Sequence, residues 1–124
     1  PKVLIDKIRI GEVLNNLLSN AIAYTQDGGR VTVWTERRGD DVVTHVQDTG
    51  EGIPKESLQH LFTKFFRISG KLEQTTKGTG LGLYISKEII QMHHGEIWVE
   101  SEAGVGSTFS FSVPTESKSL VLDF

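Results

Sequence analysis

Three glycines alternate in the segment GTGLGL, where a polar loop gives way to a helical pattern. Gly78, Gly80 and Gly82 let backbone N–H groups converge on an anion at the positive end of that helix. Phosphate is the anion that this arrangement suits best. A glycine-rich helix entry without a ligand is the structural alternative, so the segment alone indicates a phosphate site without proving one.

Three common phosphate-binding loops do not fit this segment. A Walker A loop ends in Gly-Lys-Ser/Thr, whereas Gly82 is followed by Leu83 and Tyr84. The Rossmann pattern Gly-x-Gly-x-x-Gly follows a buried strand, but the spacing here is Gly-x-Gly-x-Gly after a polar loop. A protein-kinase glycine loop is followed by a strand that bears a lysine, and here a helix is expected.

A second group of chemically competent residues lies in DTGEGIP, residues 48–54. Asp48, at the end of an expected strand, can accept hydrogen bonds from an exocyclic amine, and Gly50 and Gly52 allow the backbone to approach a flat ring. A calcium loop needs more acidic residues at alternating positions than Asp48 and Glu51 supply. An Asx-turn is the structural alternative to a ligand site.

Two asparagines lie four residues apart in a segment with helical periodicity. Asn16 and Asn20 therefore share one face of the expected helix. Asparagine is a mediocre helix former because its side chain competes for backbone hydrogen bonds. The pattern leaves a solvated face and a ligand-binding role equally open.

A long amphipathic helix must carry these asparagines. Apolar side chains recur at three- and four-residue intervals over residues 6–25, and Asp6 is a suitable N-cap. The apolar stripe consists of Ile10, Val13, Leu14, Leu17, Leu18, Ala21 and Ile22.

Period-two alternation predicts four strands in two hairpins. The first hairpin pairs residues 31–37 with 42–48, and the second pairs 96–102 with 108–114. Asp48 therefore closes the second strand of the first hairpin.

Two further helices are expected between the hairpins. A short helix over 55–62 follows Pro54, which suits its first position, and a helix over 78–95 stops at Gly95. The tail 115–124 has no clear assignment. This order of elements predicts an α+β sandwich, with one sheet and helices on one face.

The composition fits a single domain over residues 1–124. The absence of cysteine excludes a disulfide scaffold, a zinc knuckle and thiol chemistry, and no apolar run approaches the ~18 residues of a membrane span. We expect a soluble intracellular domain. The net charge of −3 argues against nucleic-acid binding, but the stretch from Ile53 to Lys87 has six basic and two acidic residues, which suits an anionic ligand.

Five motifs occur in a known order: NNLLSNAIAYT, DTGEGI, LFTKFFR, GTGLGL and GVGSTFSFSVP. Together they resemble the catalytic ATP-binding domain of sensor histidine kinases, in the superfamily shared with gyrase, MutL and the large ATP-dependent heat-shock chaperone. The resemblance runs from about residue 6 to residue 114. It implies a two-layer α/β sandwich of the Bergerat type, with a mixed, mostly antiparallel sheet and helices on one face.

The resemblance also implies a site for ATP and Mg²⁺. The family pattern makes Asn20 the Mg²⁺ ligand and places Asn16 beside the phosphates. Asn16 and Arg67, which would reach the phosphates, are the expected catalytic residues. Tyr24 would pack on the adenine ring, and Asp48 would accept the adenine amino group.

Further residues are implied around the base and the phosphates. Gly52 and Ile53 would line the base pocket, and Thr108 would support Asp48 through a water molecule. Phe62, Phe65 and Phe66 would form the hinge of a lid. The return of the lid onto the phosphates would use Lys77, Gly78, Thr79, Gly80, Leu81, Gly82 and Leu83.

Asn16 stands where gyrase-type relatives have a glutamate that activates water. An amide cannot act as a general base. The resemblance therefore implies that ATP is held without efficient hydrolysis, for transfer to a histidine imidazole on another domain. Catalysis would depend mainly on positioning and on charge neutralisation by Mg²⁺ and cations.

Three places depart from the family pattern. Ala23 replaces a basic residue that usually pairs with phosphate, so we expect either that Lys71 or Lys77 substitutes for it or that the nucleotide binds more weakly. The usual His-Gly-Gly is His94-Gly95-Glu96. The family domain also normally begins with a further strand, whereas this chain opens with PKVLID, so we expect an edge strand that is missing or replaced by the tail of another molecule.

The phosphoacceptor histidine is expected on another domain. None of the four histidines lies in the setting of the family's phosphoacceptor helix, and His93 and His94 close a helix, where an imidazole suits the dipole. The expected partners are the dimerisation and histidine-phosphotransfer domain of the same kinase and a response regulator, in the cytoplasm, with no nucleic acid and no direct membrane contact. A non-catalytic nucleotide switch and an anti-sigma-factor kinase that phosphorylates serine stay open as alternatives.

Overall fold

The computed structural model describes residues 2–66 and 81–116 of the 124-residue chain. The elements run in the order α1 (Lys7–Tyr24), β1 (Val31–Arg38), β2 (Asp41–Asp48), α2 (Lys55–Leu58), α4 (Gly82–Met92), β3 (Ile97–Glu102) and β4 (Gly106–Pro114). This is the order of helices and hairpins that the hydrophobic patterns predict.

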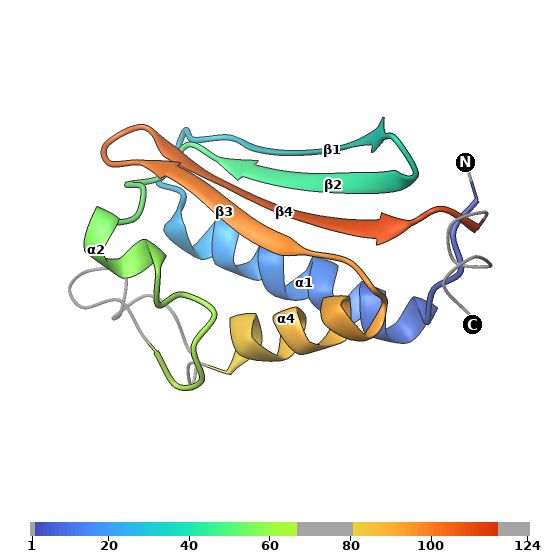
Figure 1. Ribbon diagram of the computed structural model, residues 1–124. Coiled ribbons are helices and arrows are strands. Elements are labelled where there is room, and N and C mark those ends of the chain that lie inside the picture. Colours follow the sequence, from blue (N-terminus) through green and yellow to red (C-terminus); the bar gives the residue numbers. More distant parts are fainter. Residues whose placement is uncertain (1, 67–80, 117–124) are drawn as a thin grey trace.

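The four strands form one sheet in the order β1-β2-β4-β3. All three pairings are antiparallel. The resemblance implies a mixed sheet, which would need a parallel pair, and the described strands contain none. Helices α1 and α4 lie side by side against one face of the sheet, and no described helix covers the other face (Figure 1). The predicted α+β sandwich is confirmed.

Helix α1 begins where the sequence predicts. Asp6 Oδ1 accepts hydrogen bonds from the backbone N–H groups of Ile8 and Arg9, both at 3.1 Å. One member of the predicted apolar stripe is wrong: Ile22 is 67% exposed, whereas Leu14 and Leu18 on the same side of the helix pack against the core. Neither α1 nor any other helix within residues 2–66 and 81–116 is long and apolar enough to cross a membrane.

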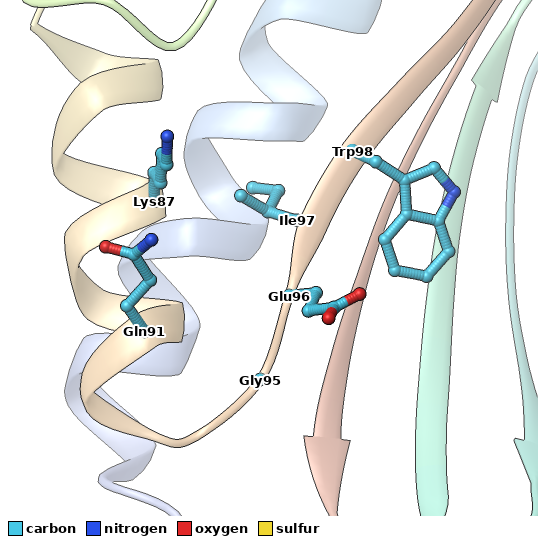
Figure 2. A pocket seen from close by; sticks show the side chains of 6 residues that line it. All are labelled: Lys87, Gln91, Gly95, Glu96, Ile97 and Trp98. Carbon is cyan, nitrogen blue, oxygen red and sulfur yellow. The ribbon is translucent and has the colours of Figure 1, made fainter.

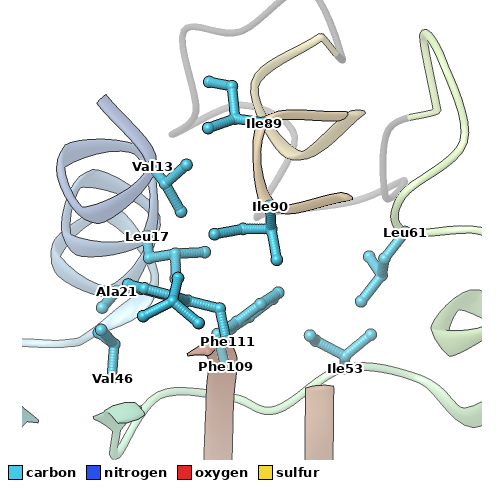
Figure 3. Packing of buried hydrophobic residues seen from close by; sticks show 11 residues of the cluster. Val13, Leu17, Ala21, Val46, Ile53, Leu61, Ile89, Ile90, Phe109 and Phe111 are labelled. Carbon is cyan, nitrogen blue, oxygen red and sulfur yellow. The ribbon is translucent and has the colours of Figure 1, made fainter. Parts of the chain in front are cut away.

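The hydrophobic core lies between the sheet and the two long helices (Figure 3). Leu17 of α1 and Ile90 of α4 are fully buried, and Phe109 and Phe111 of β4 pack in the same cluster. Burial of each large apolar side chain contributes about 1.5–3 kcal/mol, so this cluster holds both helices to the sheet. Its other buried members are Val13, Ala21, Val46, Ile53, Leu61, Ile89 and Val113.

The segment after Pro54 is less helical than predicted. α2 ends at Leu58 rather than at residue 62, and Pro54 is the N-cap, with φ −55° and ψ 140°, rather than the first helical residue. Turns continue through residues 59–65. A helix of one turn gains few hydrogen bonds for the residues that it orders, so the apolar pattern alone overestimated its length.

Helix α4 ends at Met92, with His93 as its C-cap and the left-handed residue His94 (φ 62°) after it, whereas the sequence predicts that it runs to Gly95. The N–H of Gly95 donates to Ile90 O and that of His94 donates to Gln91 O, both at 3.0 Å, which is the Schellman arrangement. Gly95 is needed for a different reason. A Cβ at this position would collide with the backbone oxygen of Ser112 on β4.

The first described residues lie beside the end of β4. Val3 forms an antiparallel bridge with Thr115, and the N–H of Glu116 donates to Lys2 O at 2.7 Å. The expectation that the tail of another molecule supplies an edge strand concerns mainly residues 117–124, which lie outside the described residues.

Candidate functional site

Asp48 is a buried carboxylate with one unused oxygen. It is the last residue of β2, is 3% exposed and lies on the helix-covered face of the sheet. Its Oδ1 accepts the N–H of Gly50 at 2.9 Å, which is the Asx-turn that the sequence allows. Its Oδ2 is also buried and has no hydrogen-bond partner in the described part of the chain. A buried acceptor without a partner costs about 1–3 kcal/mol, so this oxygen suits a donor from a ligand.

The titration of Asp48 reflects this incomplete pairing. Burial raises the pKa of the Asp48 carboxyl above its ordinary value, and hydrogen bonds from the backbone N–H groups of Gly50 and Ser107 oppose the shift. Burial prevails because the ionised carboxylate has too few donors for its charge. A ligand N–H that reached Oδ2 would stabilise the ionised form.

The turn after Asp48 is packed tightly between other segments of the chain. A Cβ on Gly50 would collide with the backbone oxygen of Tyr24, and one on Gly52, which has φ 77°, would collide with the backbone at the end of β3. These glycines therefore allow close contact between chain segments, whether or not a ring binds. Ile53 is 2% exposed and belongs to the core, and its N–H donates to Ser101 Oγ at 2.7 Å.

Thr108 lies on the other face of the sheet from Asp48. In the register of β2 with β4, Asp48 pairs with Ser107, whereas Thr108 pairs with Gln47, whose Nε2 donates to Thr108 Oγ1 at 3.3 Å. Successive side chains of a strand point to opposite faces, so the predicted support of Asp48 by Thr108 is wrong. Ser107, 4% exposed, is the β4 residue on the same face as Asp48, and its Oγ lies 2.9 Å from Ser101 Oγ. Strand alternation counted from Phe109 would have identified it.

The two asparagines share one face of α1, as predicted, and both are half-buried. Asn16 Nδ2 donates to the backbone oxygen of Gly82 at 3.3 Å and lies 3.2 Å from Ser86 Oγ. These contacts hold the first turn of α4 against the asparagine face. Tyr24, one turn beyond Asn20, is half-buried and packs against the core.

The glycine segment is described only from Leu81 onward. Leu81 is the N-cap of α4, Gly82 is its first residue, and Leu83 packs against the core. A helix therefore begins where the sequence predicts an anion-binding helix end. The predicted roles of six residues lie outside the described residues: Arg67, Lys71, Lys77, Gly78, Thr79 and Gly80.

The expected hinge phenylalanines differ in their surroundings. Phe62 and Phe66 pack against the core, whereas Phe65 is 61% exposed and has a left-handed φ of 67°. Lys64 Nζ lies 5.3 Å from the centre of the Phe65 ring and 5.8 Å from that of Tyr84 on α4. This turn therefore contacts the start of α4.

The donor set of the site fits Mg²⁺ that arrives with a nucleotide. Within residues 2–66 and 81–116, no group of three or more His, Cys, Asp or Glu side chains could hold a metal ion. The amides of Asn16 and Asn20 supply only neutral oxygens. Mg²⁺ in such a site keeps several waters and takes further oxygens from phosphates.

A groove of about 250 Å³ lies away from these residues, between the second half of α4 and the start of β3 (Figure 2). It contains none of the predicted site residues. Its lining residues are Lys87, Gln91, Gly95, Glu96, Ile97 and Trp98.

A family model matches most of the chain. Residues 5–117 match the model described as histidine kinase-, DNA gyrase B-, and HSP90-like ATPase. The chain is 40% identical over 114 residues to the sensor histidine kinase WalK of Bacillus subtilis. That alignment covers 90% of this chain and 19% of WalK, so the chain spans about a fifth of its relative.

Solved structures resemble this one closely. The catalytic domain of the histidine kinase ThkA, in a nucleotide-free form, is 37% identical with a TM-score of 0.77, over 91% of this chain and 70% of that one. Full-length ShkA in complex with AMPPNP is 30% identical with a TM-score of 0.79, over 92% of this chain and 23% of ShkA.

Proposed function

Because this chain belongs to the histidine kinase-, DNA gyrase B- and HSP90-like ATPases and is the catalytic ATPase domain of a two-component sensor histidine kinase, we propose that it binds ATP with Mg²⁺ and donates the γ-phosphate to a histidine on a separate domain. The observation that carries this proposal is the buried Oδ2 of Asp48, which has no hydrogen-bond partner among the described residues. ShkA, a relative of the same fold, binds AMPPNP, an ATP analogue.

The adenine end of the nucleotide is assigned to the turn at the end of β2. Asp48 accepts the exocyclic amino group of adenine, and Ser107 supports that carboxylate on the same face of the sheet. Guanine carries a carbonyl oxygen where adenine carries its amine. Two acceptors would then face one another, so the site favours ATP over GTP.

The phosphate end is assigned to the asparagine face of α1 and the start of α4. Asn20 provides an oxygen for Mg²⁺, and Asn16 lies beside the phosphates. The positive end of α4, together with Arg67 and a basic residue such as Lys77, offsets the charge of the triphosphate. Mg²⁺, held by Asn20, would supply charge neutralisation for the phosphates during transfer.

Transfer to an imidazole needs no water-activating base on this chain. The acceptor nitrogen attacks the γ-phosphorus, the bond from that phosphorus to the β–γ bridging oxygen breaks, and ADP leaves with the electron pair. Asn16 cannot take a proton from water, so hydrolysis stays slow while the acceptor is absent. The partners are therefore a histidine-bearing dimerisation domain and, after it, a response regulator, in the cytoplasm where ATP is present.

Phosphotransfer in trans tests this proposal. The chain is incubated with γ-labelled ATP, with and without an added histidine-phosphotransfer domain. We expect label only on the added domain, and we expect acid to remove it because phosphohistidine is acid-labile. An acid-stable product would indicate a serine kinase instead, binding without transfer would indicate a nucleotide switch, and label on the isolated chain would contradict the absence of an acceptor.

A further inference from the structure

Ser86 is a polar residue at a fully buried position of α4. It is 0% exposed, and in the same helix Ile89 and Ile90 belong to the apolar core. Its Oγ lies 3.2 Å from Nδ2 of Asn16 on α1. We propose that Ser86 is a positioning residue that, through Asn16, presents an amide oxygen to the Mg²⁺ that accompanies the phosphates, an inference that rests on the proposed function.

The Gly82 carbonyl determines which way the Asn16 amide faces. A carbonyl oxygen only accepts hydrogen bonds, and it lies 3.3 Å from Asn16 Nδ2. The nitrogen end of the amide must therefore point to α4. Ser86 Oγ, 3.2 Å from the same nitrogen, is a second acceptor that holds the amide in this orientation, with Oδ1 at its other end.

A serine at this position needs a reason other than packing. Alanine is the better helix former, and a buried hydroxyl is costly unless it is hydrogen-bonded. The pairing of α1 with α4 does not depend on Ser86 either. Leu17 and Ile90 belong to one buried cluster, and at the far end of α4 the N–H of Asp6 donates to His93 Nε2 at 3.0 Å.

The test is calorimetric titration of ATP into the wild-type chain and the Ser86→Ala variant, with Mg²⁺ and with a chelator. Loss of one hydrogen bond that orients the amide should weaken binding about fivefold with Mg²⁺ and leave it within about twofold without Mg²⁺. Ser86→Cys keeps the side-chain volume and should behave like Ser86→Ala, since a thiol is a weak hydrogen-bonding group. The matched control is Ser110→Ala, since Ser110 is also buried (2% exposed) but faces away from the site.

A double-mutant cycle separates positioning from stability. If Ser86 acts only through Asn16, Asn16→Ala/Ser86→Ala should bind Mg²⁺ and ATP as weakly as Asn16→Ala alone. The inference would be overturned if both Ser86 variants bound ATP with Mg²⁺ as tightly as the wild type. It would also be overturned if Ser110→Ala lost as much affinity as Ser86→Ala, or if the double variant bound more weakly than Asn16→Ala alone. Failure of the wild-type chain to bind ATP with Mg²⁺ would instead overturn the proposed function.

Discussion

Asp48 and His45 lie three residues apart on β2, both almost fully buried, but on opposite faces of the sheet. Both ring nitrogens of His45 have partners: Nδ1 lies 2.6 Å from Ser110 Oγ, and Nε2 lies 2.8 Å from Glu36 Oε2. The ring also stacks on Trp34, with centroids 4.8 Å apart. Asp48 uses one oxygen in its own turn and leaves the other without a partner in the described part of the chain.

This difference separates a structural polar group from a binding group. A buried polar side chain with all its partners stabilises the fold, whereas one that lacks a partner destabilises the free protein until a ligand supplies it. His45 by itself could be mistaken for a catalytic residue, since it lies between a serine and a glutamate. Its neighbour Ser110 is only 2% exposed, so this group has no accessible nucleophile.

Removing the carboxylate of Asp48 should have the largest effect on function. Asp48→Asn replaces one oxygen by a donor that faces the adenine amine, so ATP affinity should fall roughly ten- to hundredfold, the scale of a hydrogen bond to a charged group. The free energy of unfolding should stay equal or rise, because an under-paired buried carboxylate is removed. Titration calorimetry and chemical denaturation measure the two quantities. Asp40→Asn, at an exposed turn, is the control and should change neither the ATP affinity nor the free energy of unfolding. If Asp48→Asn were strongly destabilised but still bound ATP normally, Asp48 would be the structural group and not the binding group.

Removing His45 should affect stability and leave binding intact. His45→Ala leaves Ser110 without its partner and opens a cavity beside Trp34, so the free energy of unfolding should fall by about 2 kcal/mol. ATP affinity should stay within about twofold, because the ring is on the opposite face from Asp48. Denaturant titration with and without the added change Ser110→Ala checks this. The second change should recover part of the loss, and a large drop in ATP affinity would count against the comparison.

The smallest expected effect concerns how the free energy of unfolding depends on pH in the wild-type chain and in Asp48→Asn. Because the folded-state pKa of Asp48 is raised, the native state binds more protons than the unfolded state from about pH 4 up to that raised pKa. Stability relative to Asp48→Asn should therefore decline as the pH rises through this window. Glu36 acts oppositely: hydrogen bonds from Arg38 and then His45 lower its pKa, so its contribution is lost as the pH falls through the lowered pKa. Denaturation at pH 4 to 7 measures the difference, and a constant gap between wild type and Asp48→Asn would refute the assignment.

Much of the fold could be predicted because the large apolar side chains of its elements lie mainly on one face. The apolar spacing of α1 and the alternation in β4 identify a helix and a strand that cover one core. The exposed position of Ile22 and the early end of α2 could not be predicted in this way, since both depend on where neighbouring elements end. The left-handed residue after α4 is His94 rather than Gly95, and Gly95 instead lies too close to the backbone of Ser112 for a side chain, a contact that the sequence does not show.

The candidate site residues could be singled out wherever a single residue type carries the chemistry. The structure places Asn16 and Asn20 on one face of α1 and leaves Oδ2 of Asp48 without a partner among the described residues, while the roles of all three stay predictions. Thr108 was wrong because neighbouring residues of a strand face opposite sides, and alternation from the buried Phe109 puts Ser107, not Thr108, on the face of Asp48. Ser86 was not predicted because, in sequence, it looks like an ordinary helix residue, and only the packing of α4 on α1 brings it to Asn16.

Calorimetric titration of the chain with ATP and with GTP, each with and without Mg²⁺, tests the central claim most directly. Suppose that Oδ2 of Asp48 accepts a hydrogen bond from the adenine amine and that the asparagine face holds Mg²⁺ with the phosphates. ATP with Mg²⁺ should then bind most tightly of the four combinations. GTP should then bind at least about tenfold more weakly. Equal affinity for the two nucleotides, or ATP binding that does not depend on Mg²⁺, would contradict this account of the site.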